Sequence, residues 1–80
     1  MEDFTPLYIK LYIKLKSKIK IGEIPYEYRL PSIVQMSEME RISTQTVKKA
    51  YQKLIDENYI ISKRSSGYYV IYKDDKKVTS

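Results

Sequence analysis

Apolar residues at helical spacing define the first predicted element. Between residues 5 and 22, apolar side chains three or four positions apart form a stripe of Tyr8, Leu11, Tyr12, Leu15 and Ile19. This spacing places them on one face of an α-helix. Thr5 followed by Pro6 is typical of a helix start, because the threonine hydroxyl can cap the first turn and a proline at the first helical position loses no hydrogen bond. We therefore predict an amphipathic helix from Thr5 to Gly22.

Two more helices are predicted around a short turn. Ser32 closes a Leu-Pro-Ser motif, and Gln35 completes a capping box, in which the hydroxyl and the amide side chain each bond a free backbone N–H. Ser43 is expected to cap the next helix, from Thr44 to about Glu57. The apolar stripe of that helix consists of Val47, Ala50, Tyr51 and Leu54. Two helices joined in this way match a helix-turn-helix.

The last part of the chain has the pattern of a β-hairpin. Residues 59–63 and 68–72 are rich in β-branched and aromatic side chains, and the segment 64–67 between them ends in Gly67, a turn residue. Asn58 is expected to end the third helix in a left-handed conformation, and a short strand is expected at 28–30. A lone hairpin is marginal in water, so it must pack on the helices. We therefore predict an α+β fold, a winged helix-turn-helix of three helices and a β-hairpin wing.

The composition argues against an enzyme. The 80 residues contain no His, Cys or Trp, which removes the commonest metal ligands, a Cys nucleophile, a Ser-His-Asp relay and every disulfide. A chain of this size also leaves little room for an enclosed substrate cavity. We expect a binding module without catalytic residues, cofactor or metal.

Charge and hydropathy bear on the partner and the location. The net charge of +5 favours an anionic partner, either nucleic acid or an anionic membrane surface. No apolar run approaches the roughly 20 residues of a membrane span, so we expect a cytoplasmic protein that does not enter a membrane. Residues 1–72 are expected to form one domain, and residues 73–80 a charged, solvated tail.

A set of short motifs lies in a fixed order along the chain. The motifs are Thr5-Pro6-Leu7-Tyr8, Gly22, Leu30-Pro31-Ser32, Ser43, Thr46-Val47, Ala50-Tyr51-x-x-Leu54, Asn58-Tyr59-Ile60 and Gly67-Tyr68-Tyr69-Val70. In this order and spacing the chain resembles the DNA-binding domain of the GntR family of bacterial transcription regulators over nearly its whole length. The resemblance implies that the helix-turn-helix enters the major groove of DNA and that the wing reaches the minor groove.

The chain departs from the pattern of that family at several positions. Family members usually carry an arginine two residues after the Leu-Pro-Ser serine and another just after the serine that caps the third helix, and both touch DNA. Here these positions are Val34 and Thr44, while the basic position after the Thr-Val pair is Lys48. The Pro-Gly of the family is Tyr26-Glu27, and the first glycine of its wing motif is Ser65. Base contacts are therefore expected from other side chains.

The candidate DNA contacts lie at two places in the predicted fold. The outer face of the third helix carries glutamines that can bond adenine and lysines that can reach guanine or phosphate, and hydroxyls near its start suit phosphate oxygens. The hairpin turn forms a compact basic tip that suits a minor groove. The full set is Ser43, Thr44, Gln45, Thr46, Lys48, Lys49, Gln52, Lys63, Arg64, Ser65, Ser66 and Gly67. We expect a transcriptional regulator that binds double-stranded DNA, with repression as its expected effect.

A second interpretation remains open, because the same fold can serve as a protein–protein interaction module without sequence-specific DNA binding. The missing arginines favour it, and so do two isoleucines, Ile9 and Ile13, that lie off the core stripe of the first helix. Phe4 is expected to pack on Ile9 as a hydrophobic staple, which leaves Ile13 without a partner in the core. A homodimer through Ile9 and Ile13 would explain both residues. Binding that weakens steeply with salt would favour DNA over an apolar partner.

Overall fold

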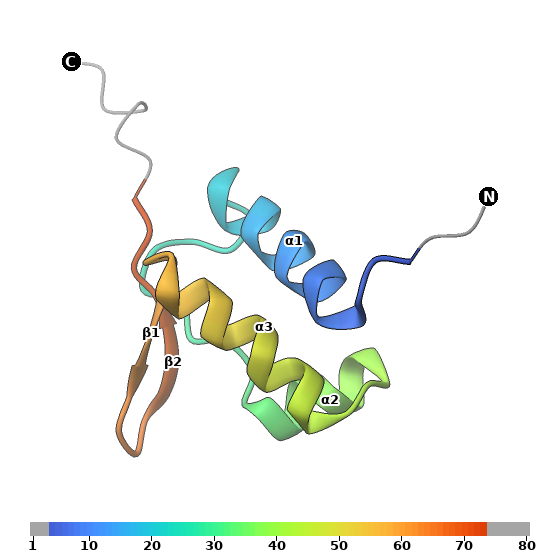
Figure 1. Cartoon of the computed structure of the whole chain (residues 1–80). Helices are drawn as coiled ribbons and strands as arrows, with labels where there is room; N and C mark the ends of the chain where they lie inside the picture. The colour runs from blue at the N-terminus through green and yellow to red at the C-terminus, as the bar shows by residue number, and fades with distance from the viewer. Residues whose placement is uncertain (1–3, 74–80) are drawn as a thin grey trace.

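The structure, a computed structural model, describes residues 4–73. Its elements are α1 (Leu7–Lys20), α2 (Ile33–Glu40), α3 (Thr44–Asp56), β1 (Ile60–Lys63) and β2 (Gly67–Val70). Both α1 and α2 pack against α3, and the hairpin extends from the C-terminal end of α3 (Figure 1). The arrangement confirms the predicted α+β fold, a winged helix-turn-helix. Of the predicted tail, residues 74–80 lie outside the described residues.

The start of α1 differs from the prediction. Its N-cap is Pro6, whose carbonyl accepts hydrogen bonds from the N–H groups of Ile9 and Lys10, and no side chain caps this end. Pro6 has a ψ of 149°, outside the helical region, so Pro6 and not Thr5 occupies the N-cap position. Phe4 is 84% exposed. Both the Thr5 cap and the staple between Phe4 and Ile9 were therefore wrong predictions.

The helix-turn-helix is built as the sequence predicts. The Ser32 hydroxyl accepts a hydrogen bond from the N–H of Gln35, and the Gln35 side chain accepts one from the N–H of Ser32, both at 3.0 Å. Arg41 ends α2 in the left-handed conformation, with a φ of 58°. Ser43 then caps α3, because its hydroxyl accepts a hydrogen bond from the N–H of Thr46 at 3.1 Å. Local side-chain bonds thus define both sides of the turn.

The predicted apolar stripes of α1 and α3 meet in one core. Its buried side chains are Leu11, Tyr12, Leu15, Ile19, Leu30, Met36, Val47, Ala50, Tyr51, Leu54, Ile60 and Val70. The Tyr51 hydroxyl donates a hydrogen bond to the Pro31 carbonyl at 2.8 Å, and burial raises the pKa of this hydroxyl. The Tyr51 ring also contacts Tyr68 edge-on, with the ring centres 4.9 Å apart. One residue of α3 therefore contacts both the segment before α2 and the wing, and this holds α3 in a defined orientation.

The wing is shorter than predicted, and the strand expected at 28–30 is reduced to a single bridge. β1 and β2 pair antiparallel from Ile60 with Val70 to Lys63 with Gly67, so residues 71–72 lie beyond the sheet. Arg29 forms an isolated bridge with Tyr69 on the other side of β2.

Several non-glycine residues adopt positive φ angles. Asn58 has a φ of 66°, which confirms its predicted role at the end of α3. Glu27 and Ser65, with φ of 71° and 68°, occupy positions at which the resemblance led us to expect glycine. The left-handed region costs an L-residue roughly 1–2 kcal/mol. The backbone therefore keeps the conformation that glycine favours even where the glycine is absent.

Candidate nucleic-acid interface

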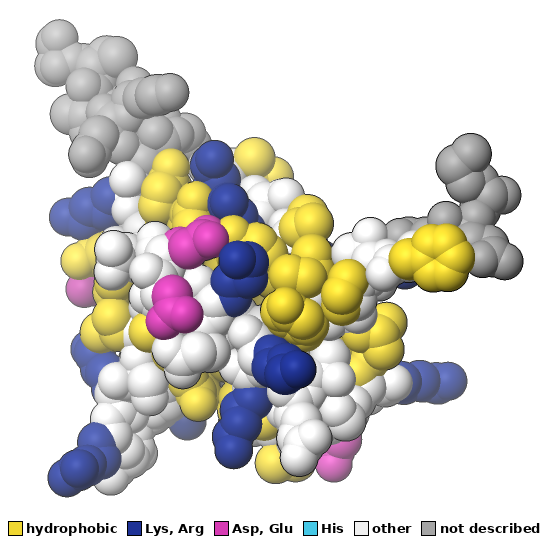
Figure 2. Space-filling model, in the orientation of Figure 1, with side chains coloured by type: hydrophobic (Ala, Val, Ile, Leu, Met, Phe, Trp, Pro, Cys, Tyr) yellow, Lys and Arg dark blue, Asp and Glu magenta, His cyan; other side chains and the backbone are white. Residues whose placement is uncertain are grey.

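The outer face of α3 forms the first part of the candidate interface. Gln45, Lys48, Lys49 and Gln52 are all exposed there, because the buried stripe of the helix faces the core. Figure 2 shows basic side chains over the part of the molecule where α1 and α3 lie and at the free end of the wing, whereas acidic side chains gather near the C-terminal end of α3. This distribution favours the N-terminal part of α3 as the anion-binding end.

Gln45 is more available for a base contact than Gln52. The Gln52 amide donates a hydrogen bond to Asp56 Oδ1 at 2.9 Å, and this carboxylate would repel a nearby phosphate. Among residues 4–73, Gln45 forms no side-chain hydrogen bond and lies in the first turn of α3. The end of a recognition helix that reaches base edges is its N-terminal end, so the structure strengthens the case for Gln45.

The predicted hydroxyl groups at the start of α3 are partly engaged with one another. Ser43 Oγ and Thr46 Oγ1 lie 2.8 Å apart and share a hydrogen bond, while Ser43 also caps the helix. Thr44 is exposed as the first residue of α3. Thr44 and the free N–H groups of the first turn are therefore the groups best placed to bind a phosphate.

The beginning of α1 also reaches this surface, which the sequence did not indicate. An open cleft of about 510 Å³ lies between the two helix starts, and it is lined by Pro6, Leu7, Tyr8, Ser43, Gln45, Thr46 and Lys49. Lys49 Nζ lies 5.4 Å from the centre of the Tyr8 ring, a distance typical of a cation–π contact. Tyr8 therefore helps to position a lysine that was predicted to bind DNA.

The wing tip forms the second part of the interface. The pairing of Lys63 with Gly67 leaves residues 64–66 as the loop, and all of them are exposed. The N–H of Ser66 bonds the Lys63 carbonyl at 3.0 Å, which closes the turn. The tip points away from the three helices (Figure 1). Arg64 is thus presented at the far end of the hairpin.

Three lysines of α1, Lys14, Lys16 and Lys18, differ from those of the candidate interface in being ion-paired. Lys14 Nζ lies 2.9 Å from Glu40 Oε2, and Lys18 Nζ lies 3.5 Å from Glu23 Oε2. The candidate contacts that form no ion pair within residues 4–73 are Lys48, Lys49, Lys63 and Arg64. The positive charge that remains available to an external anion therefore includes all four basic residues of the predicted interface.

Lys53, which lies beside the outer face of α3, belongs to a cluster that joins α3 to α1. The Tyr12 hydroxyl donates a hydrogen bond to Glu57 Oε1 and accepts one from Lys16 Nζ at 3.0 Å. The bond from Tyr12, together with the nearby charges of Lys16 and Lys53, lowers the pKa of Glu57. Lys53 Nζ lies 3.5 Å from Glu57 Oε2. Because Lys53 is paired with Glu57, it is a poorer candidate for a phosphate contact than the lysines without an ion pair.

Two isoleucines of α1, Ile9 and Ile13, lie where the sequence placed them, off the buried stripe. Ile13 is 51% exposed and Ile9 is half-buried.

Within residues 4–73 no helix is both long and apolar enough to cross a membrane, and no group of acidic side chains is arranged to hold a metal ion.

Comparisons with known proteins agree with this geometry. Residues 7–70 match the family model described as bacterial regulatory proteins, gntR family. The chain is 39% identical over 69 residues to the uncharacterized HTH-type transcriptional regulator YdeL of Bacillus subtilis, a match that covers 86% of this chain and 15% of YdeL. It is 34% identical to the HTH-type transcriptional repressor STM4068 of Salmonella typhimurium, over 85% of this chain and 28% of that protein. The chain thus spans less than a third of the length of these relatives.

Solved structures show the same fold. YtrA from Sulfolobus acidocaldarius, a GntR-family transcription factor, is 30% identical with a TM-score of 0.82, and the match covers 95% of this chain and 80% of YtrA. AraR(DBD) in complex with operator ORE1 has a TM-score of 0.81 over 88% of this chain and 85% of that one, at 23% identity. The first likeness agrees with the family model, and the second concerns the fold alone.

Proposed function

Since the chain belongs to the gntR family of bacterial regulatory proteins, we propose that it is the DNA-binding domain of a transcriptional regulator and that it binds double-stranded DNA through α3 and the wing. The observation that carries the proposal is the position of the cations that have no ion pair. Lys48 and Lys49 lie on the exposed face of α3, and Lys63 and Arg64 lie at the wing. Such cations bind phosphates by releasing counterions from DNA.

We propose that α3 enters the major groove and that the wing lies at the adjacent minor groove. A major groove about 12 Å wide admits an α-helix, and the outer face of α3 has no other element packed on it in the described part of the chain. The wing tip is narrow and basic, which suits a minor groove bordered by phosphates. The interface therefore combines base contacts from α3 with phosphate contacts from both elements.

We propose repression as the effect on transcription and the bacterial cytoplasm as the location. One relative, STM4068, is named a transcriptional repressor. A domain that occupies DNA through two elements can act by excluding other proteins from the same site. The cytoplasm follows from the proposed partner, because bacterial DNA lies there.

Selection of bound duplexes from a random-sequence pool tests the proposed function. The folded chain should enrich a short motif, and a pair of motifs about one helical turn apart if it binds as a dimer. The alternative, a protein-interaction module, predicts no enrichment at any salt concentration. Failure of the folded chain to retain any duplex at low salt would refute DNA binding altogether.

Gln45→Ala is expected to relax the base preference of the domain. A glutamine can bond adenine through two hydrogen bonds, so its loss should cost roughly 1–3 kcal/mol on the selected site and little on random DNA. Lys49→Ala is the matched control, since it should weaken selected and random duplexes alike and reduce the salt slope by about one unit. Fluorescence anisotropy on both duplexes measures the difference. Equal losses of affinity on both duplexes for Gln45→Ala would show that Gln45 does not contact a base. Lys48 or the wing would then be the next candidates for that contact.

We further propose a homodimer through the exposed side of α1. Ile13 is 51% exposed, and Leu7, also on α1, is 56% exposed; Figure 2 shows hydrophobic side chains gathered over α1. Ile13→Lys should leave the fold intact and shift the sedimentation mass from dimer to monomer, because a charge on an apolar interface must be desolvated. If the parent and the variant both sediment as monomers at high concentration, Ile13 is a single exposed apolar residue of the common kind.

A further inference from the structure

Arg29 is held beside the wing by backbone bonds on both sides of it. It forms a bridge with Tyr69, and the N–H of Leu30 bonds the Tyr68 carbonyl at 2.8 Å. The N–H of Val70 bonds the Tyr28 carbonyl at 3.0 Å. The connection between α1 and α2 therefore presents the Arg29 side chain from a fixed position along β2.

The guanidinium of Arg29 lies directly over Gly67. A Cβ atom at residue 67 would lie 3.0 Å from Arg29 Nε and 3.5 Å from Nη2, and Gly67 has a φ of 123°. Glycine is thus required there by the backbone conformation, and its missing side chain leaves space for the arginine. The guanidinium is consequently stacked at the base of the basic tip instead of extending freely into solvent.

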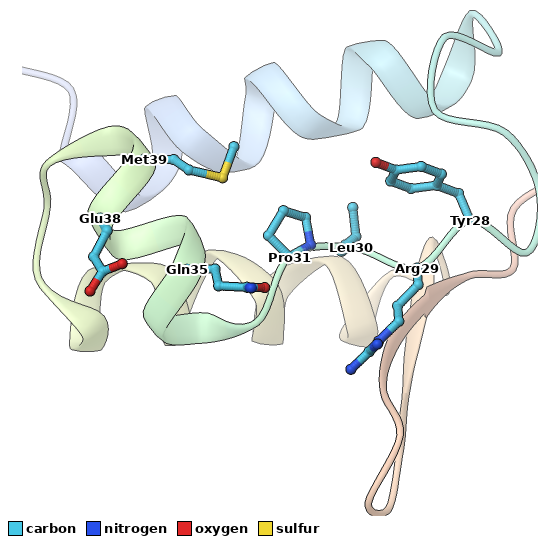
Figure 3. A pocket seen from close by; sticks show the side chains of 7 residues that line it. All are labelled: Tyr28, Arg29, Leu30, Pro31, Gln35, Glu38 and Met39. Carbon is cyan, nitrogen blue, oxygen red and sulfur yellow. The ribbon is translucent and has the colours of Figure 1, made fainter.

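The Arg29 side chain also points towards the proposed DNA side and has its charge available. In Figure 3 it runs along the hairpin away from α1, whereas the ring of Tyr28 lies on the α1 side of the same connection. Both residues line an open cleft of about 450 Å³, which includes Glu38. Neither Glu38 nor any other carboxylate within residues 4–73 forms an ion pair with Arg29.

We propose that Arg29 is a DNA contact, whose guanidinium binds a backbone phosphate at the edge of the groove that the wing tip occupies. A planar guanidinium can form two parallel hydrogen bonds to a phosphate. A phosphate is favoured over a base because the Arg29 guanidinium lies over Gly67, the last paired residue of β2, while residues 64–66 extend beyond it. The inference rests on the proposed function and adds a contact from outside both α3 and the wing.

The contact would also compensate for the two arginines that the chain lacks. Val34 is 57% exposed on α2, and Thr44 is exposed at the start of α3, so neither position contributes charge. The chain has three arginines, Arg29, Arg41 and Arg64. Arg64 lies at the wing tip and Arg29 beside the wing, so the proposed contact would move guanidinium recognition from the helix-turn-helix to the wing side of the domain.

Arg29→Met tests the contact, because methionine keeps an apolar stem over Gly67 and removes the charge. On a short duplex of mixed sequence at low salt, its affinity should fall about tenfold, and the slope of log K against log salt should shrink by about 0.9. Arg29→Lys should retain the parental slope but lose about threefold in affinity, since an ammonium group cannot form two parallel bonds. Lys20→Met is the control for charge alone, because Lys20 is exposed at the end of α1 and should bind like the parent.

Failure of the inference can be told from failure of the proposed function. If Lys49→Ala loses affinity while Arg29→Met binds like the parent, Arg29 makes no contact although the domain binds DNA. If the parent itself does not bind, the proposed function is wrong, and the inference is wrong with it. If Arg29→Met melts well below the parent, Arg29→Lys decides the matter: a threefold loss of affinity at the parental slope supports the contact, whereas parental affinity in that variant would overturn the proposed two-bond contact of the guanidinium.

Discussion

A tenfold increase in salt is expected to weaken DNA binding by this domain roughly 10⁴-fold. If about four phosphates are neutralised, the slope of log K against log salt is on the order of −4. Lys48, Lys49, Lys63 and Arg64 supply these contacts, since all four are exposed and without an ion pair in the described part of the chain. The contact proposed for Arg29 would steepen the slope by about 0.9. Titration of a fluorescent duplex at several salt concentrations measures the slope directly.

A pair of double variants identifies which lysines produce the slope. Lys48→Met with Lys49→Met should bring it to about −2, because two phosphate contacts are lost. Lys14→Met with Lys18→Met removes the same charge, but these lysines are already paired with Glu40 and Glu23. That control should keep the parental slope. Equal changes in both double variants would show that net charge alone, and not the proposed interface, governs binding.

Leu54→Ala is expected to destabilise the domain by about 2–5 kcal/mol. The side chain is fully buried, with 0% exposure, on the inner face of α3. A domain of 80 residues has a total stability of only about 4–12 kcal/mol, so the loss is a large part of the whole. Chemical denaturation followed by circular dichroism gives the change in the free energy of unfolding.

Leu7→Ala is the matched control for this prediction. It makes the same chemical change on α1 at a side chain that is 56% exposed in the single chain. At protein concentrations too low for the proposed dimer, the free energy of unfolding should therefore change by less than about 0.5 kcal/mol. A loss as large as that of Leu54→Ala would mean that Leu7 is covered in solution, for example by a second copy of the chain. A small loss in Leu54→Ala would contradict the packing of α3 described above.

The sequence by itself determined the elements whose causes are local. The stripe from Leu11 to Ile19 and the capping box of Ser32 and Gln35 involve residues three or four positions apart, which the helix itself brings together. The turn at Asn58 depends on one residue type that tolerates the left-handed region. The order of these elements was enough to predict a winged helix-turn-helix, and most of the candidate contacts then followed from the outer face of the third helix.

The tertiary structure decided the features that depend on residues far apart in the chain. The bond between Tyr12 and Glu57 joins residues 45 positions apart, and the same carboxylate pairs with Lys53 beside the outer face of α3. The pairing of Lys14 with Glu40 spans 26 positions, and the stacking of Arg29 on Gly67 depends on a single bridge to β2. A hydrophobic pattern determines which face of a helix is buried, but it contains no information about which charged side chains meet across the surface. The charge left available to DNA is therefore set by long-range contacts that only the packed chain creates.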